Sequence, residues 1–484
     1  MERRGNALAP AHDRSIIPRM LWCSGLFALP GIGFLIVFLL ARPQEFVPML
    51  QRVPFLYVFT VLAVLGYVID LRLRRSQPIA VNTLWWVVAL FGWAVIATAL
   101  AAPDQIVPRA IEMAILFALY GTIAHGIQRF RGFQVVAGVV AVTCLFISAV
   151  CFHQDLSPRQ CIGGEEADGA IEGKPDGRFC ETSLDCHGPE ADPDLEYRCE
   201  HVGLFGTYSV EDRVRYRGDL KDPNEVALTL CAGALGMLIG FTLRKPRPTS
   251  QLAIGLAIVI VVFTVFFTQS RGGLVAAMLI PAVFWIRRNG IAALIPAVLL
   301  GAPVMILGGR SGDAAELSTD MRYDAWATGL DLWHHSPIWG VGARQFTEHH
   351  FLTAHNSFVL ALSELGIVGL FLFVAVIYLC MKTLIVGVRE VSKRPGTAAA
   401  EAWGMALLAA MCGIVFQINT LSFTYHPVLW LFVGLCGAWS SAVRHHWPEF
   451  HVTLTFRDVL FVAVLVIAYA TVILPGFLIV KGYY

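Results

Sequence analysis

The chain has 484 residues, of which 56% are hydrophobic and only 15% are charged. This composition excludes an ordinary soluble domain, in which about 25% of residues are charged. The formal net charge of +1 says nothing about partners, and no nucleic-acid partner is expected.

Apolar segments long enough to cross a bilayer recur along the whole chain. Thirteen are predicted, with one or two open to doubt in the count, so the expected fold class is an all-α, polytopic integral membrane protein with about 12–13 transmembrane helices. No signal-peptide cleavage pattern follows the basic N-terminus, so the first segment is expected to be retained. The segments are Leu21–Leu40, Pro54–Ile69, Ile79–Ala101, Ile106–Ile127, Phe133–Phe152, Glu225–Phe241, Leu252–Thr268, Gly272–Ile286, Ile291–Leu307, Ser357–Leu379, Ala402–Thr420, Val428–Val443 and Val459–Val480.

The predicted helices divide the loops into two alternating sets, and more than half of the 36 lysines and arginines lie in one of them. The short loops of the other set hold only Arg42, Arg52, Arg109, Arg271 and Lys481. The positive-inside rule therefore predicts a cytoplasmic N-terminus. The expected organisation is helices 1–5 over 1–152, a long outer loop over 153–224, helices 6–9 over 225–307, a second long outer loop over 308–355, and the C-terminal helices over 356–484. Thirteen spans would place the C-terminus outside. With one span fewer, the C-terminus would lie in the cytoplasm.

The first long loop contains four cysteines, Cys161, Cys180, Cys186 and Cys199, in a polar and glycine-rich segment. We expect two disulfides in an oxidising compartment, although three pairings are possible and the sequence does not choose among them. A zinc site is the competing interpretation, but the spacing lacks the paired CxxC pattern of zinc knuckles. The disulfide interpretation agrees with an outer position for this loop.

Arginines at two places suggest recognition of an anion. Arg213, Arg215 and Arg217 alternate with apolar residues, so an extended backbone would place three guanidiniums on one face. The guanidinium group suits bidentate contacts with phosphate oxygens. Arg271 begins a membrane helix at a tight turn, where backbone amides and the helix dipole also favour an anion. An edge strand kept soluble by charge and an arginine that meets lipid phosphates are the alternatives.

The second long loop is expected to contain a helix from Met321 to Trp333, with one apolar side that rests on the membrane surface or covers a cavity. After it, His355 and Asn356 precede an apolar run that contains Gly366 and Gly369. On a continuous helix these glycines would share a face with His355 and let a neighbouring helix approach closely. A metal site at the nearby histidines is disfavoured, because no HExxH spacing is present.

Four stretches, in the same order, resemble the bacterial O-antigen ligase family, which includes the related O-antigen polymerases. The first two are Arg215-x-x-Gly218 followed by Asp222-Pro-Asn224, and the turn Gln269-Ser-Arg-Gly-Gly273. The other two are Arg322 to Trp326 followed by Pro337-x-x-Gly340-x-Gly342, and His355-Asn-x9-Gly366-x-x-Gly369. The cysteine-rich insertion and a thirteenth helix depart from the family pattern.

The resemblance implies a GT-C-like membrane glycosyltransferase in the bacterial inner membrane, acting at the periplasmic face without a cofactor, metal or nucleotide sugar. The implied donor is a glycan on undecaprenyl diphosphate, and the acceptor is lipid A-core or a second lipid-linked glycan; a protein acceptor stays open. Such an enzyme would serve lipopolysaccharide and other surface-polysaccharide biosynthesis. The family motifs place Arg215, Arg271 and His355 in catalysis, and we expect Arg217, Arg322 and Asn356 to bind substrate.

Two other classes of function are consistent with a polytopic chain. A transporter or flippase of lipid-linked sugars would predict ionisable residues midway along helices and an inverted repeat. Neither feature is clear in the sequence. The few carboxylates in or beside the predicted helices, Glu225, Glu364 and Glu401, do not form a relay. A non-enzymatic scaffold of the cell envelope would make Arg271 and His355 dispensable.

Overall fold

The computed structural model describes residues 25–483 with gaps at 168–169, 190, 193, 245–246 and 291–312. Within these residues the N-terminal helices are α1 (Ala28–Leu40), α2 (Pro43–Phe46), α3 (Phe55–Arg72), α4 (Leu84–Ala101), α5 (Ile106–Gly126) and α6 (Phe130–Leu156). Three strands follow: β1 (Arg159–Ala167), β2 (Ala170–Phe179) and β3 (Glu196–His201). The remaining helices begin with α7 (Pro223–Thr229), which continues through a π-helical turn (Leu230–Gly236) into α8 (Met237–Leu243).

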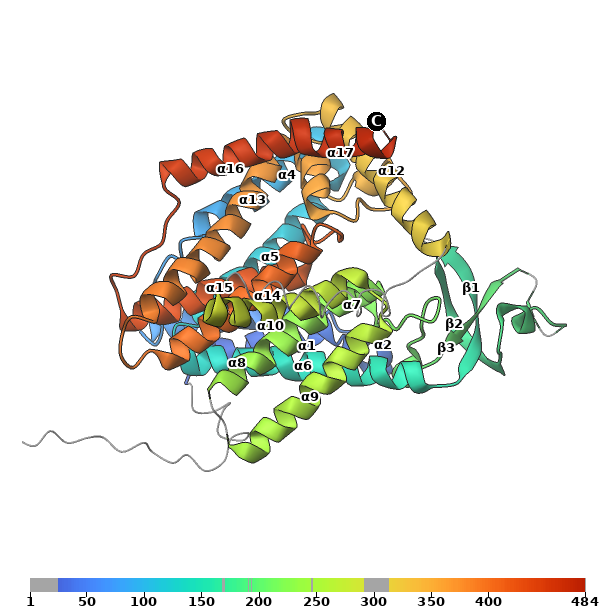
Figure 1. Cartoon of the computed structure of the whole chain (residues 1–484), viewed down its shortest axis with the longest axis horizontal. Coiled ribbons are helices and arrows are strands. Elements are labelled where there is room, and N and C mark those ends of the chain that lie inside the picture. The colour runs from blue at the N-terminus through green and yellow to red at the C-terminus, as the bar shows by residue number, and fades with distance from the viewer. Residues whose placement is uncertain are drawn as a thin grey trace, which may run out of the picture.

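The second half of the chain is helical almost throughout. Its helices are α9 (Pro248–Phe267), α10 (Arg271–Asn289), α12 (Asp313–His335), α13 (Ser357–Val391), α14 (Ala398–Gln417) and α15 (Pro427–His446). The last stretch joins α16 (Phe456–Ala468), a second π-helical turn (Tyr469–Ile473) and α17 (Leu474–Lys481). In Figure 1 this red C-terminal stretch crosses the ends of the bundle beside α12 and α13.

The prediction of an all-α, polytopic membrane protein is confirmed. Ten of the described helices are long and apolar enough to cross a membrane, and α1 is a shorter apolar helix. The segment predicted at 272–286 is also helical, within α10, whereas the one at 291–307 lies outside the described residues. An antiparallel sheet of strand order β2-β1-β3, which was not predicted from the sequence, occupies the cysteine-rich insertion.

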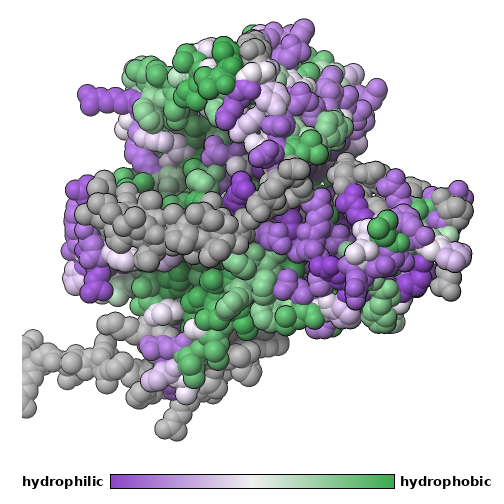
Figure 2. All heavy atoms as spheres, turned by 45° about the vertical axis from the view of Figure 1, so that its right-hand side comes forward, coloured by the Kyte–Doolittle hydropathy of each residue, from purple (hydrophilic) through white to green (hydrophobic). Residues whose placement is uncertain are grey.

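Burial divides the helices into an inner and an outer group. Most residues of α13, α14 and α15 are buried, and those of α15 from Val428 to Val443 are buried throughout. Helices α3, α9 and α16 instead expose many large apolar side chains, as expected for helices that face lipid. Figure 2 shows hydrophilic residues gathered over the sheet and hydrophobic residues over the adjoining helices.

Contacts join the loops within each of the two alternating sets that the sequence predicts. The set that includes both long loops is linked by Arg42–Asp219 (2.5 Å), Arg344–Glu112 (2.8 Å) and Gln417 Nε2–Asn224 O (2.9 Å). The other set is linked by Gln77 N–Gln128 Oε1 (2.8 Å), Arg444 Nη1–Ala80 O (2.9 Å) and Arg287–Glu401 (2.5 Å). Segments far apart in the sequence therefore assemble at two separate ends of the bundle.

Candidate functional site

His355 lies at the end of the long connection between α12 and α13, immediately before Asn356, the N-cap residue of α13. Its backbone is left-handed, with φ of +44°, which is uncommon for a residue with a side chain. Asn356 is the N-cap of α13, and its Oδ1 accepts hydrogen bonds from Phe358 N (2.9 Å) and Val359 N (3.2 Å). The structure therefore gives Asn356 a helix-capping contact beside the candidate base.

The surroundings of His355 keep its imidazole neutral near neutral pH. The pKa of His355 is lowered to about 4, first by burial and then by the charge of Arg322, whereas Asp222 acts in the opposite direction. Among the described residues, no group donates a hydrogen bond to this imidazole or accepts one from it. A neutral imidazole with both nitrogens available is suited to accept a proton from a substrate hydroxyl.

Two other histidines at this end of the bundle are fully engaged. His426 donates through Nε2 to Asp219 O (3.0 Å) and accepts from Val428 N at Nδ1 (3.2 Å), so it caps α15. His350 contacts Asp324 Oδ2 through Nε2 (3.2 Å), and its Nδ1 accepts from Leu352 N (3.0 Å). These contacts distinguish His355 from His350 and His426 as the candidate base.

The turn that carries Arg271 adjoins the start of α7 and the end of α14. Ser270 caps α10 by accepting a hydrogen bond from Gly273 N (3.0 Å), and the Arg271 side chain is exposed. A Cβ atom at Gly272 would lie only 3.3 Å from side-chain atoms of Gln417 and Thr420. Gln417 donates to the backbone of the Asp222–Asn224 stretch, so Arg271 lies next to a loop junction on the same end of the bundle as His355.

The first turn of α13 closes this junction. Ser357 N donates to Ile418 O (2.8 Å), and Ser357 Oγ donates to Leu421 O (2.6 Å), so the residues after α14 lie against the residue that follows Asn356. The stretches around 222–224, 268–273, 355–357 and 417–421 are thus connected by direct contacts. The 417–421 stretch was not predicted to belong to the site, because it contains no charged residue that would indicate a functional role.

The three alternating arginines have different partners. Arg213 reaches the turn before Arg271, where its Nε donates to Thr268 O (3.0 Å), and its Nη2 contacts Asn224 Oδ1 (3.3 Å). Arg215 is buried; its Nε donates to Tyr208 O (3.2 Å) and its guanidinium lies over the Tyr208 ring. Arg217 lies over the ring of Phe46. The prediction that one extended face presents all three guanidiniums is wrong, since Arg213 turns toward α9 and α10 while Arg215 turns toward Tyr208.

The prediction of one continuous helix face below His355 is also wrong. Helix α13 is interrupted at Gly366, which has φ of +66° and ψ of −170°. A Cβ atom at Gly366 would lie 2.1 Å from Ile338 O, so this glycine admits the 337–342 loop and not a neighbouring helix. The interruption changes the direction of the chain between His355 and Gly369, so the two do not share a helix face.

The 337–342 loop satisfies the peptide groups that the interruption would otherwise leave unpaired. Val341 N donates to Ser363 O (3.0 Å), Gly342 N donates to Glu364 O (2.9 Å), and Ile367 N donates to Pro337 O (2.8 Å). In addition, the indole of Trp93 donates to Leu365 O (2.8 Å). The motif from Pro337 to Gly342 and the interruption of α13 at Gly366 are therefore held together by hydrogen bonds. We call this contact the joint at Gly366.

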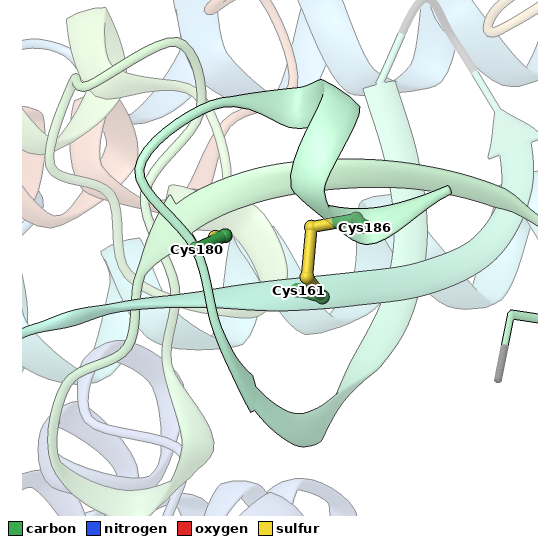
Figure 3. Close-up of side chains that lie close together, drawn as sticks. All are labelled: Cys161, Cys180 and Cys186. Carbon is green, nitrogen blue, oxygen red and sulfur yellow. A yellow bond between two sulfur atoms is a disulfide. The ribbon is translucent and has the colours of Figure 1, made fainter. Parts of the chain in front are cut away.

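The sheet of the first long loop is closed by two disulfides. Cys161 pairs with Cys186 and Cys180 pairs with Cys199, and Figure 3 shows the first pair with Cys180 beside it. The sulfurs of Cys161, Cys180 and Cys186 lie within 4.8 Å of one another, but their disulfides leave no thiolate to bind a metal. The structure therefore supports two disulfides at these four cysteines in place of a zinc site.

The sheet contacts the loop that carries Arg215. Tyr208, whose ring lies against Arg215, accepts a hydrogen bond from Gly173 N of β2 at its hydroxyl (3.2 Å). Glu200 of β3 is buried, and its carboxylate accepts from Ser209 Oγ (2.5 Å) and Glu211 N (2.8 Å). The insertion is thereby tied to a residue of the candidate site.

The fold and this site define a polytopic, mainly helical membrane protein whose loops gather arginines and His355 at one end of the bundle. Residues 256–374 match the family described as O-antigen ligase. The match supports the resemblance to the O-antigen ligase family noted in the sequence, and with it a glycosyltransferase-type role in surface polysaccharide biosynthesis. The matched region includes Arg271, Arg322 and His355, whereas Arg215 lies before it. A comparison with curated proteins gave no match.

Proposed function

We propose that this protein transfers a glycan from an undecaprenyl-diphosphate donor to an acceptor hydroxyl at the periplasmic face of the inner membrane, as an O-antigen ligase or polymerase. The observation that carries the proposal is the available, neutral imidazole of His355 in a domain of the O-antigen ligase family. Lipid A-core is the acceptor for a ligase, and a second lipid-linked glycan is the acceptor for a polymerase.

In the proposed reaction, the acceptor oxygen attacks the anomeric carbon of the sugar attached to the diphosphate. The bond between this carbon and the phosphate oxygen breaks, and its electron pair leaves with undecaprenyl diphosphate. His355 takes the proton of the acceptor hydroxyl, which keeps charge from accumulating on the attacking oxygen. The step needs no cofactor or metal, because fixed cations supply the stabilisation.

We assign the diphosphate to the arginines around the loop junction. Arg271 begins α10, where backbone amides and the helix dipole add to its charge. Arg215 follows from the family motif, Arg217 is added because it lies two residues further along the same segment, and the contact of Arg213 with Thr268 O supports its addition to this group. Arg322 acts on His355 electrostatically and is assigned to the glycan or diphosphate. Fixed guanidiniums stabilise charge as it develops on the leaving group.

The orientation rests on the lysine and arginine distribution, which supports a cytoplasmic N-terminus and outer long loops. The contacts that join the loops within each set, and the two disulfides, are consistent with this orientation. The helix boundaries observed in the structure also support the proposed organisation into two blocks of helices before the second long loop and a C-terminal block after it.

The test is glycolipid analysis of a deletion strain that expresses the wild type, His355→Ala or His349→Ala. His349 is a matched control, since it is an exposed histidine of the same loop. We expect His355→Ala to abolish transfer at normal expression and His349→Ala to preserve it. Polymer retained on undecaprenyl diphosphate with bare lipid A-core would identify a ligase, and single repeat units would identify a polymerase. Full activity of His355→Ala would overturn the assignment.

A further inference from the structure

Helix α12 packs against the segment that carries His355 and reaches it through a tryptophan. Ala325 and Leu330 of α12 are buried, and a Cβ atom at Gly329 would lie 2.6 Å from Val359 of α13. One turn before this close approach, the indole Nε1 of Trp326 donates a hydrogen bond to Ala354 O at 2.8 Å. Ala354 O belongs to the peptide bond that joins Ala354 to His355.

We propose that Trp326 is a positioning residue for His355, which it orients by holding the Ala354 carbonyl. This inference rests on the proposed function, because it gives Trp326 a role through the candidate base. Trp326 touches no reacting atom in this proposal. Its contribution is to fix the peptide whose rotation would change the direction of the imidazole.

The backbone of His355 needs such support. A φ of +44° is unfavourable for a residue with a Cβ atom, so a free loop would relax toward negative φ. On the C-terminal side the conformation is held by the Asn356 cap and by the hydrogen bond from Ser357 N to Ile418 O. Trp326 supplies the corresponding contact on the N-terminal side, so the histidine is fixed from both directions.

Trp326 is itself held by aromatic neighbours. Its ring lies 5.6 Å from that of Tyr323 on the same helix and 5.7 Å from that of Phe477 on α17. Tyr323 also contacts Phe477 (5.3 Å) and Tyr483 (5.7 Å). Figure 1 shows α17 beside α12, so the C-terminal stretch supports the face of α12 that carries Trp326.

The same helix carries the charge that acts on the imidazole. Arg322 lies one helical turn before Trp326, and its charge contributes to the lowered pKa of His355. The other groups that act on this imidazole are Asp222 before α7 and His350 of the same loop. Loss of the Trp326 contact should therefore alter both the direction and the protonation of His355, which a purely space-filling role would not do.

The informative variant is Trp326→Phe, because it retains an aromatic ring and removes only the indole N–H group and part of the ring. Trp333→Phe is the matched control. Trp333 lies two turns further along α12, and its indole donates to Pro337 O (3.2 Å), away from His355. Phe477→Ala is a second probe, since it removes support behind Trp326 without touching the hydrogen bond itself.

The measurements are kcat, KM for a lipid-linked glycan and the pH dependence of kcat, made on the full-length protein in lipid nanodiscs. We expect Trp326→Phe to lower kcat about tenfold, because loss of the hydrogen bond to Ala354 O lets the imidazole of His355 leave its reactive orientation, with KM nearly unchanged. The acid limb of its pH profile should move to higher pH, because a more hydrated His355 regains a higher pKa. Phe477→Ala should give a smaller change in the same direction, and Trp333→Phe should behave as the wild type.

The possible failures are distinguishable. If His355→Ala is inactive while Trp326→Phe keeps the wild-type kcat and pH profile, the positioning role is wrong and the proposed function stands. If His355→Ala is active, the proposed function itself fails. If Trp326→Phe does not fold, an unchanged kcat and pH profile for a folded Phe477→Ala would overturn the inference.

Discussion

The substitution Gly366→Ala tests whether the interruption of α13 is required for the fold. Alanine at this position would have to adopt φ of +66° and ψ of −170°, a region open essentially to glycine alone. Such backbone strain costs about 1–3 kcal/mol. The added methyl group would also lie 2.1 Å from Ile338 O, so the 337–342 loop would have to move.

Movement of this loop would weaken the three backbone hydrogen bonds between residues 337–342 and 363–367. Each contributes about 0.5–1.5 kcal/mol, so strain and the loss of all three hydrogen bonds together amount to about 2.5–7.5 kcal/mol. This is a large fraction of the typical stability of a protein, which is about 5–15 kcal/mol. We therefore expect Gly366→Ala to lower the melting temperature strongly and to reduce the folded fraction in detergent.

Gly92→Ala is the control, since Gly92 lies in α4 with nothing within 4 Å of an added Cβ atom. Helix propensity predicts a gain of up to about 1 kcal/mol there. Both variants would be compared by thermal unfolding and gel filtration of the full-length protein. If Gly366→Ala melts at the same temperature as Gly92→Ala, the interruption of α13 at Gly366 is not required for the stability of the fold.

Three further predictions concern the site and the sheet. Arg271→Ala should abolish transfer, and Arg271→Lys should restore little of it in the same glycolipid assay, because lysine lacks the bidentate fork; full rescue by lysine would contradict a specific phosphate contact. If His355 is the base, kcat should stay level from pH 8 down to about 5 and fall only near its lowered pKa of about 4, and a fall centred at 6.5 would contradict this environment. The contribution of neutral His355 to the stability of the fold is fully present above the ordinary histidine pKa of 6.5 and is lost as the pH falls toward the lowered pKa, because the unfolded chain binds the proton first. Cys180→Ser with Cys199→Ser should destabilise the sheet by about 3 kcal/mol, measured by hydrogen exchange, with turnover affected less; unchanged exchange would refute the stabilising role.

The sequence was sufficient for the fold class because lipid imposes a strong constraint on composition. Long apolar runs predicted nearly all of the helices, and the alternation of loops agrees with the contacts that join them. The disulfide pairing was beyond sequence reasoning, because the three possible pairings of four cysteines differ only in the path of the chain between them. The sheet itself lies in a glycine-rich, charged segment with weak strand periodicity.

Site residues were predictable by type and motif, but not by direction. Arg213 and Arg215 are two residues apart and chemically identical, yet one contacts Thr268 O and the other lies over the Tyr208 ring. That difference depends on the positions of α9 and the sheet, which are fixed by distant contacts. Trp326 was visible only as one apolar residue of a helix, because nothing in its spacing indicates a hydrogen bond to Ala354 O.

The spacing between His355 and Gly366 has a structural explanation that helix periodicity alone did not suggest. The nine residues Ser357–Leu365 form a short helix with a cap at one end and an interruption at the other. Asn356 and Ile418 fix its beginning, while the 337–342 loop fixes its end. One inserted residue would rotate these ends by about 100° relative to each other and separate them by about 1.5 Å. His355 would then lose its alignment with α12, so the length of this helix, more than the identity of its residues, relates the histidine to the joint at Gly366.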